Sequence, residues 1–315
     1  MRDMAETGVN VRDFGARGDG AADDTEAVQA AVNARTENGG GTVHLPAGTY
    51  RLTSAVWVNS GITLAGAGTA GTVLRQSSVT EDGIRGQDTE YVTVRDLTVA
   101  GPGTGRGNGI RLTRSAGPCV PYCAFERVRA RQWGNCGFTG DTLIVSRFDG
   151  CVAEANGGDG FQLTSASGNT TSTAFTACYA NANAGTGYEL GRAVYCHLSG
   201  CAADGNSGGG YALYGCEAVV LAGCGAEANR GAAVLLSGGR GNAVTGLWAN
   251  VNAGCGVRLS GGESAATLTG CVERSAAGAS HFILADPGTS VSAVNCAGIT
   301  PSAFHGTAAR PEAGE

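Results

Sequence analysis

The stretch Cys178-Tyr-Ala-Asn-Ala-Asn-Ala-Gly-Thr-Gly-Tyr-Glu-Leu190 recurs 23 residues later as Cys201-Ala-Ala-Asp-Gly-Asn-Ser-Gly-Gly-Gly-Tyr-Ala-Leu213. In both copies an asparagine follows the cysteine by five residues, and a Gly-Tyr pair begins nine residues after it. A repeat this short, with three positions kept in step, is typical of a solenoid, in which each unit packs only against its neighbours.

The same register runs from about residue 148 to residue 298. The cysteine position holds, in order, Cys151, Cys178, Cys201, Cys224, Leu247, Cys271 and Cys296. The asparagine position holds Asn156, Asn183, Asn206, Asn229 and Asn252. Each unit reads as two short strands, one around the cysteine and one at the Gly-aromatic-x-Leu segment, joined by an Asn-Gly turn. Coils stacked ~4.8 Å apart place like residues on one another, so we expect inward reduced thiols and a hydrogen-bonded asparagine ladder.

The composition excludes several classes of function. Hydrophobic residues make up 42% of the 315 residues, and no apolar run approaches the ~18 residues of a membrane-spanning helix. The net charge of −6 gives no electrostatic basis for binding nucleic acid. All 21 basic residues are arginine, so no lysine can act as a base or nucleophile. The first eight residues lack the apolar core of a secretory signal, which predicts a disordered N-terminus and a cytoplasmic protein.

The N-terminal part carries a distinct pattern. It begins with Asn10-Val-Arg-Asp-Phe-Gly-Ala-Arg-Gly-Asp-Gly20 and continues through Asp23-Asp-Thr-Glu-Ala-Val-Gln-Ala-Ala-Val32 and Gly39-Gly-Gly-Thr-Val-His-Leu-Pro-Ala-Gly-Thr-Tyr50. Asp24 or Thr25 is a good N-cap for a helix over about residues 24–35 that covers the first coil. The pattern resembles the opening of pectate-lyase-superfamily proteins, a group with polygalacturonase-like hydrolases, phage tailspikes and mannuronan epimerases. The implied fold is all-β: a single-stranded right-handed parallel β-helix (solenoid) over residues 9–300 with an N-terminal capping helix, followed by a C-terminal tail at 301–315.

The resemblance also implies where a substrate binds, because enzymes of this superfamily hold it in a groove along one parallel sheet. If that sheet is formed by the Gly-aromatic-x-Leu strands, its outward positions can be read from the repeat. Polar residues concentrate over residues 109–192, near loops at 101–107 and 114–124 that we expect to bulge from one side of the stack. The candidate catalytic residues are Glu189, Asp141, Arg111, Asp159 and Tyr214. The candidate substrate-binding residues are Gln162, Thr139, Thr164, Arg192, Leu235, Arg258 and His281.

The roles follow from residue chemistry. A glutamate among apolar neighbours has a raised pKa and suits general acid or base work. Arg111 or Arg192 can hold a carboxylate or polarise a carbonyl. No metal site or cofactor is expected, with calcium as the alternative if the protein is a polysaccharide lyase. A second outward row (Glu154, Asn181, Asp204, Glu227 and Asn250) is interpreted as a solvated face rather than a calcium site.

The motifs of the superfamily's known enzymes are largely missing. Neither the Gly-His-Gly and Arg-x-Lys of the hydrolases nor the Asp-Pro-His of the epimerases occurs, since Asp286-Pro287 is followed by Gly288. Short actinobacterial proteins that resemble pectate lyases are associated with polyketide pathways, including transannular ring closure. We therefore expect a metal-independent cyclase or isomerase acting on a small or polyketide-like metabolite. The alternatives are a lyase, epimerase or glycoside hydrolase acting on uronate-type sugars, and a non-catalytic carbohydrate-binding or tailspike-like β-helix. The expected partner is a small molecule or an oligosaccharide, and neither nucleic acid nor a membrane is expected.

Overall fold

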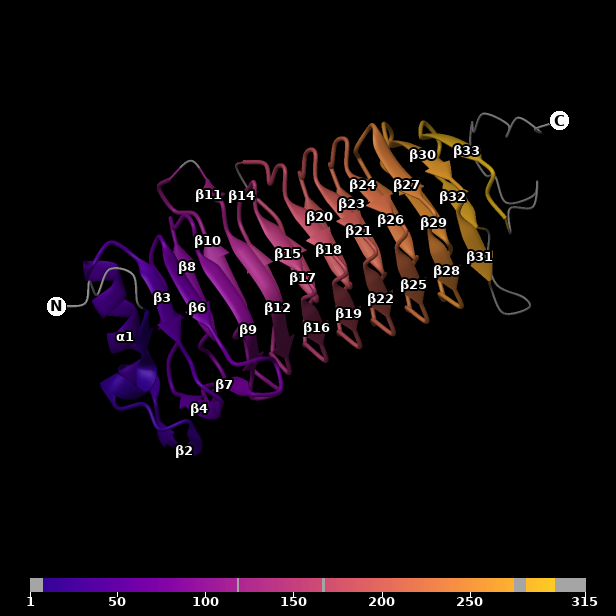
Figure 1. The fold of residues 1–315 in the computed structure, drawn as a ribbon. Helices are drawn as coiled ribbons and strands as arrows, with labels where there is room; N and C mark the ends of the chain where they lie inside the picture. The colour runs from indigo at the N-terminus through magenta and orange to yellow at the C-terminus, as the bar shows by residue number, and fades with distance from the viewer. Residues whose placement is uncertain (1–7, 118, 166–167, 275–281, 298–315) are drawn as a thin grey trace.

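The protein is a parallel β-helix whose coils stack along one axis, with the only α-helix of the described part at the N-terminal end (Figure 1). The computed structural model describes residues 8–117, 119–165, 168–274 and 282–297. The predicted disordered N-terminus, apart from Gly8, and the predicted tail lie outside these residues. None of the helices in the described residues is long and apolar enough to cross a membrane.

Sheet B contains the Gly-aromatic-x-Leu strands, as the repeat predicts. All of its strands are parallel and in register, so that each coil contributes one strand. In chain order they are β5 (Val56–Trp57), β8 (Ile84–Gln87), β10 (Ile110–Thr113), β13 (Phe138–Gly140), β17 (Phe161–Leu163), β20 (Tyr188–Gly191), β23 (Tyr211–Tyr214), β26 (Val234–Ser237), β29 (Val257–Ser260) and β32 (Ile283–Ala285).

Sheet A bends into two faces, because each of the long strands β9 (Thr93–Ala100) and β12 (Ala124–Arg131) pairs with two successive short strands, those of the preceding coil for β9 and those of the following coil for β12. The first face also holds β1 (Val9–Asn10), β3 (Gly41–His44), β6 (Ile62–Ala65), β15 (Arg147–Asp149), β18 (Ala174–Thr176), β21 (His197–Ser199), β24 (Val220–Ala222), β27 (Asn242–Thr245), β30 (Ala265–Thr269) and β33 (Ser290–Val294). The second face holds β2 (Asp19–Asp23), β4 (Gly48–Leu52), β7 (Thr72–Gln76), β16 (Val152–Glu154), β19 (Tyr179–Asn181), β22 (Ala202–Asp204), β25 (Gly225–Glu227), β28 (Trp248–Asn250) and β31 (Val272–Arg274). A two-stranded sheet C joins β11 (Val120–Pro121) to β14 (Leu143–Ile144).

Two expectations from the sequence need correction. Each repeat has three strands rather than two, because the first face of sheet A contributes its own. From β15 to β24 these strands have three residues with one inward side chain, as in His197–Ser199, which is too short to show alternation. The loops at 101–107 and 114–124 do not bulge from one side. They precede and follow β10, so they lie at opposite ends of that strand.

The capping helix α1 spans Thr25–Glu37, with Val28, Ala31 and Val32 buried against the first coil. It begins one residue later and ends two residues later than predicted. Asp24 occupies the N-cap position, but its carboxylate accepts hydrogen bonds from the backbone N–H groups of Arg17 (2.7 Å) and Gly18 (3.0 Å) instead. Burying the open end of the solenoid in this way protects core residues and strand edges that would otherwise face water.

The predicted asparagine ladder is confirmed. From Asn183 onward, each amide oxygen accepts hydrogen bonds from the backbone N–H and the side-chain amide of the asparagine one coil earlier, as between Asn183 and Asn206 (3.0 and 2.9 Å). Each Nδ2 also donates to a carbonyl of the second face of sheet A, that of Ala180 in strand β19 in the case of Asn206 (3.2 Å). All five asparagines are at most 2% exposed. The ladder therefore satisfies buried turn groups that water cannot reach.

Apolar side chains in the interior also stack on the equivalent side chains of the neighbouring coils. Phe138, Phe161, Tyr188 and Tyr211 stack face to face along sheet B at 4.8–4.9 Å between ring centroids. A second stack from sheet A (Phe125, Phe148 and Phe175) meets the first edge-on. All twelve cysteines are free thiols, and burial raises the pKa of Cys216, for example, to about 11. The inward, reduced thiols expected from the repeat are confirmed.

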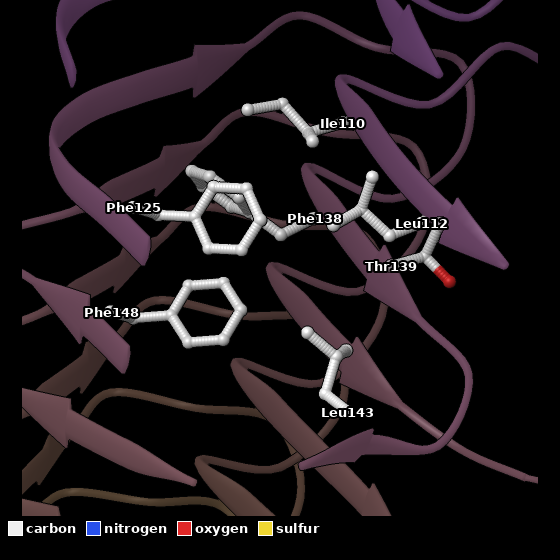
Figure 2. Close-up of a pocket in the computed structure, with 7 residues that line it drawn as sticks. All are labelled: Ile110, Leu112, Phe125, Phe138, Thr139, Leu143 and Phe148. Carbon is white, nitrogen blue, oxygen red and sulfur yellow. The ribbon is translucent and has the colours of Figure 1, made fainter. Parts of the chain in front are cut away.

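One leucine position in sheet B is filled from outside the strand. Gly140 stands where its neighbours carry Leu112 and Leu163, and a Cβ at Gly140 would meet the side chain of Leu143 at 1.9 Å. Figure 2 shows Leu143 lying among Phe138, Phe148 and Leu112, while the Thr139 hydroxyl points away from the rings. The gap between these side chains has no room for a water molecule, so it is part of the core and not a ligand site.

Replacing Asn206 by alanine should lower the free energy of unfolding by roughly 2–4 kcal/mol, because it leaves the buried backbone N–H of Asn183 without an acceptor and removes one of the two acceptors of the Asn183 side-chain amide. The control is Asn181→Ala on the partly exposed second face of sheet A, which should change stability by less than about 0.5 kcal/mol. Urea denaturation followed by circular dichroism measures both. Equal effects of the two substitutions would contradict a structural role for the ladder.

The Gly140–Leu143 pair predicts a compensating double substitution. Leu143→Ala alone should destabilise the protein by about 2–5 kcal/mol, since it leaves a core cavity. Gly140→Leu alone should also destabilise it, because the new side chain meets Leu143. In the double variant the leucine at position 140 occupies the vacated space, and the free energy of unfolding should recover. Additive losses in a double-mutant cycle would refute this account.

Candidate functional site

The register of sheet B places the predicted outward residues in one row along the solenoid. Arg111 pairs with Thr139, Thr139 with Gln162, and Gln162 with Glu189. The row continues through Ala212 and Leu235 to Arg258. With ~4.8 Å per coil, Arg111 and Glu189 stand ~14 Å apart. The candidates therefore form an elongated track and do not converge on one small ligand.

Three of the predicted residues form a hydrogen-bonded unit at the centre of this track. The Gln162 side-chain amide donates to Asp159 Oδ2 (2.8 Å) and to Glu189 Oε1 (3.4 Å). The backbone N–H of Thr186 donates to Asp159 Oδ1 (2.7 Å). Both carboxylates bind the same nitrogen, so these two oxygens lie no more than about 6 Å apart. We refer to Asp159, Gln162 and Glu189 as the carboxylate pair site.

The surroundings change the acidity of both carboxyl groups. Burial raises the pKa of Glu189, and the negative charge of Asp159 raises it further. Burial also raises the pKa of Asp159, although the hydrogen bonds from Thr186 and Gln162 partly oppose this. A carboxylate with a raised pKa is a stronger base than an ordinary one and gives up a captured proton less readily. Proton transfer is the chemistry that this site suits.

A hollow of about 240 Å³ lies one coil beyond Glu189. Its floor is made of small residues such as Gly209, Ala212 and Ala232, and Tyr214, Arg230 and Arg258 stand around it. Burial raises the pKa of Tyr214, as do the charges of Glu189 and Asp159, so the phenol stays protonated. Arg258 also reaches the carboxylate of Asp286 (3.4 Å). Leu235, a predicted binding residue, also lines this hollow.

Arg230 was missed by the sequence reasoning. It follows Asn229 in the turn before strand β26, outside the outward positions that the repeat predicts for binding. Only the fold brings this turn to the hollow, so no periodic signal marked it.

Arg111 is held at the N-terminal end of the track by groups that the sequence did not single out. The Asp82 carboxylate is 5% exposed and lies 3.9 Å from Arg111 and 4.0 Å from Arg85. The Arg85 guanidinium stacks over Trp57, 4.7 Å from the ring centroid. Arg111 is thus a candidate for contact with an extended ligand, and it is too distant to act with Glu189 on one reacting atom.

The remaining candidates lie around the track. Asp141 and Thr164 occupy the second outward row, where Asp141 accepts a hydrogen bond from the Thr142 hydroxyl (2.7 Å). Arg192 lies in the turn after β20, and its backbone N–H donates to Tyr214 (2.7 Å). His281 lies outside the described residues. These positions are compatible with substrate contact, and their roles stay predictions.

The donor set does not fit calcium. The described residues include no group of three or more His, Cys, Asp or Glu side chains placed to hold a metal ion. The carboxylate pair site offers two carboxylates and an amide, whereas calcium takes six to eight oxygen ligands. In the row from Glu154 to Asn250, Glu154 is engaged by Arg129 (2.6 Å) and Glu227 by Asn250 (2.9 Å). The reaction steps below therefore use only the protein's own groups.

Comparison with known proteins identifies the family. Residues 82–272 match the family described as "Right handed beta helix region", and residues 8–111 match "Rhamnogalacturonase A/epimerase, pectate lyase-like". The chain belongs to the right-handed β-helix family. The fold class expected from the repeat and the pectate-lyase-like resemblance of the N-terminal pattern are both confirmed.

Similar proteins include several that act on alginate-type polymers. Mannuronan C5-epimerase AlgE4 of Azotobacter vinelandii is 34% identical over 174 residues, which are 48% of this chain and 31% of that protein. Alginate lyase 7 of the same organism is 30% identical over 201 residues, 50% of this chain and 24% of that protein. The chain therefore matches less than a third of the length of these two relatives. The solved AlgE4 A-module superposes with a TM-score of 0.75 at 23% identity, covering 96% of this chain and 100% of the module, which supports the fold alone.

The raised pKa of Glu189 predicts a pH-dependent effect of Glu189→Gln on stability. The folded-state pKa of Glu189 is higher than its pKa in the unfolded chain, so ionising this group destabilises the folded protein. The destabilisation is absent at pH values below the unfolded-state pKa and complete at pH values above the folded-state pKa. Relative to the parent, the variant should therefore gain stability as the pH rises from about 3 to about 7. Chemical denaturation across this range measures it, with the exposed Glu227→Gln as the control for introducing an amide. A variant whose relative stability falls over the same range would contradict the assigned burial of Glu189.

Proposed function

We propose that this protein is a polysaccharide epimerase or lyase that acts on uronate sugars bound along the outward row of sheet B. The carboxylate pair site beside the hollow of Tyr214, Arg230 and Arg258 is the observation that carries the proposal. The relatives named as mannuronan C5-epimerase and alginate lyase support the same substrate class. The support for a cyclase was a family association alone, and the relatives favour the uronate alternative.

The two reactions share their first step. The proton on C5 of a uronate is weakly acidic because it lies next to the carboxylate, and a positioned base removes it. Glu189 suits this role, since its raised pKa brings it closer to neutral pH than an ordinary glutamate. The guanidinium group of Arg230 suits the sugar carboxylate, because charge-assisted hydrogen bonds stabilise the enolate formed on proton loss.

The second step decides the product. Tyr214 stays protonated. It lies on strand β23 of the next coil, two residues after Ala212, which pairs in register with Glu189. If it donates its proton to the opposite face of C5, the sugar is epimerised. If it donates to the departing oxygen at C4, the C4–O bond breaks and an unsaturated uronate forms. Asp159 and Gln162 act as positioning residues, because they hold the Glu189 carboxyl group.

The elongated track fits a chain better than a compact metabolite. One coil advances ~4.8 Å, which is roughly the length of one sugar residue. Arginines stand at both ends of the row, Arg85 and Arg111 at one and Arg258 at the other, and the carboxylate pair site lies between them. An acidic chain lying along the row can therefore contact cations on each side of the reacting sugar.

A panel of polymannuronate, polyguluronate and polygalacturonate tests the proposal. A lyase releases unsaturated products that absorb near 232 nm, and an epimerase exchanges the C5 proton for solvent deuterium without chain cleavage. Glu189→Gln should lower kcat at least about a hundredfold, the usual size of a general-base contribution. The matched control Glu227→Gln, on the second face of sheet A, should retain activity.

Three outcomes would overturn the proposal. The first is an inactive parent on every polyuronate. The second is full activity of Glu189→Gln. The third is the release of reducing ends without absorbance at 232 nm, which would indicate hydrolysis by the two carboxylates instead.

A further inference from the structure

A second hollow lies on the second face of sheet A, near the N-terminal end of the solenoid. Its volume is about 380 Å³, and its walls include Arg51, Arg75, Gln132 and the segment Gly101-Pro102-Gly103. Strands β4 and β7, which carry the two arginines, lie at the lower edge of the molecule in Figure 1, next to helix α1. No residue lines both this hollow and the one beside Glu189. We call it the arginine hollow.

The two arginines of this hollow begin a column of paired positions along the solenoid that ends at Arg131, a residue that does not itself line the hollow. Arg51 pairs in register with Arg75, Arg75 with Ala100, and Ala100 with Arg131. Three guanidinium-bearing positions therefore occur within four coils, with ~4.8 Å between Arg51 and Arg75. Ala100 places a small side chain in this column after Arg75, and the next residue, Gly101, lines the hollow. The hollow therefore opens where the column lacks a bulky side chain.

Several other arginines of sheet A form ion pairs with carboxylates, whereas in the described part of the chain the arginines of this column do not. Arg127, Arg129 and Arg147 pair with acidic groups at 2.5–2.6 Å. Within the described residues, no carboxylate oxygen lies within 4.0 Å of the Arg51, Arg75 or Arg131 guanidinium groups.

Several hydrogen-bond donors of these arginine side chains are not used within the described part of the protein, so they remain available for a ligand. The nearest acid in register, Asp23, accepts hydrogen bonds from Thr25 and Thr53 instead of pairing with Arg51. Arg51 uses only its Nε, which donates to the carbonyl of Ala21 (2.9 Å). Within the described residues, the terminal nitrogens of Arg51 and the whole guanidinium group of Arg75 make no hydrogen bond or ion pair, so their donors remain available to a ligand in the hollow.

We propose that the arginine hollow binds an acidic sugar through an oxyanion group, either a carboxylate or a phosphate ester. Guanidinium groups bind both oxyanions through paired, charge-assisted hydrogen bonds. The volume accommodates a monosaccharide-sized ligand, and the Gln132 side-chain amide supplies a neutral polar contact for hydroxyl groups. The site is separate from the sheet B track, so it does not depend on the reaction proposed above.

Isothermal titration calorimetry with four probes tests the site. D-glucuronate and glucose 6-phosphate carry the two oxyanions, inorganic phosphate carries the charge without the sugar, and glucose carries the sugar without the charge. We expect binding of at least one charged sugar that weakens as salt is added, and no binding of glucose. Binding of inorganic phosphate as tight as that of the sugars would show that the hollow recognises the anion alone, which overturns the sugar part of the proposal.

Matched arginine variants locate the binding. Arg75→Gln removes a side chain with no internal contact and should weaken binding about tenfold or more while leaving the thermal unfolding midpoint unchanged. Arg240→Gln, on the surface pair with Glu217, should have no effect. Arg230→Gln tests the hollow beside Glu189. If Arg230→Gln abolishes binding of the probes and Arg75→Gln does not weaken it, this inference is wrong, while the proposed function stands. Absence of binding of all four probes up to about 10 mM would also overturn it.

Discussion

The structure depends on keeping each coil in register with the next, and the buried asparagine ladder enforces this register. An amide side chain can accept from the coil before and donate to a strand carbonyl of that coil only if its neighbour stands at the same position one coil away. A shift by one residue would leave several buried polar groups unpaired and turn each strand's inward side chains outward. The stacked aromatic rings and buried thiols follow the same register without enforcing it, because apolar contacts tolerate small shifts.

This constraint also determines what kind of site the protein can build. Because each coil contributes one outward residue to a row, functional groups are arranged in a line with a fixed spacing. The carboxylate pair site arises where two neighbouring positions of the row are polar and a third group, Asp159, precedes one strand. The two hollows arise beside small residues, at Gly209 and Ala232 in the turns before strands β23 and β26 and at Ala100 on sheet A. Departures from the repeat, rather than the repeat itself, create the binding surface.

The charges of the outer faces divide into two classes. On most of sheet A, arginines and carboxylates of neighbouring coils pair with each other, as Arg147 does with Glu126. In the arginine hollow, Arg51 and Arg75 have no carboxylate within 4.0 Å in the described residues, whereas Arg85, Arg111 and Arg258 on sheet B lie 3.4–4.0 Å from carboxylates. Exposed pairs contribute little to stability, so the paired class mainly lowers the net charge of the surface. The unpaired class is the basis of the acidic-sugar site that we propose in the arginine hollow.

The sequence by itself determined the coil architecture, the inward thiols, the asparagine ladder and the residues of the outward row. It could do so because all of these follow from periodicity, which a single sequence displays directly. It did not reveal the third strand of each coil, since one inward residue among three shows no alternation. Nor did it reveal which row members touch. The contacts of Gln162 with both carboxylates, the turn of Arg111 toward buried Asp82 and the placement of Arg230 at the hollow depend on side-chain directions and on turns from separate coils. Those are decided by packing in three dimensions, which only the tertiary structure contains.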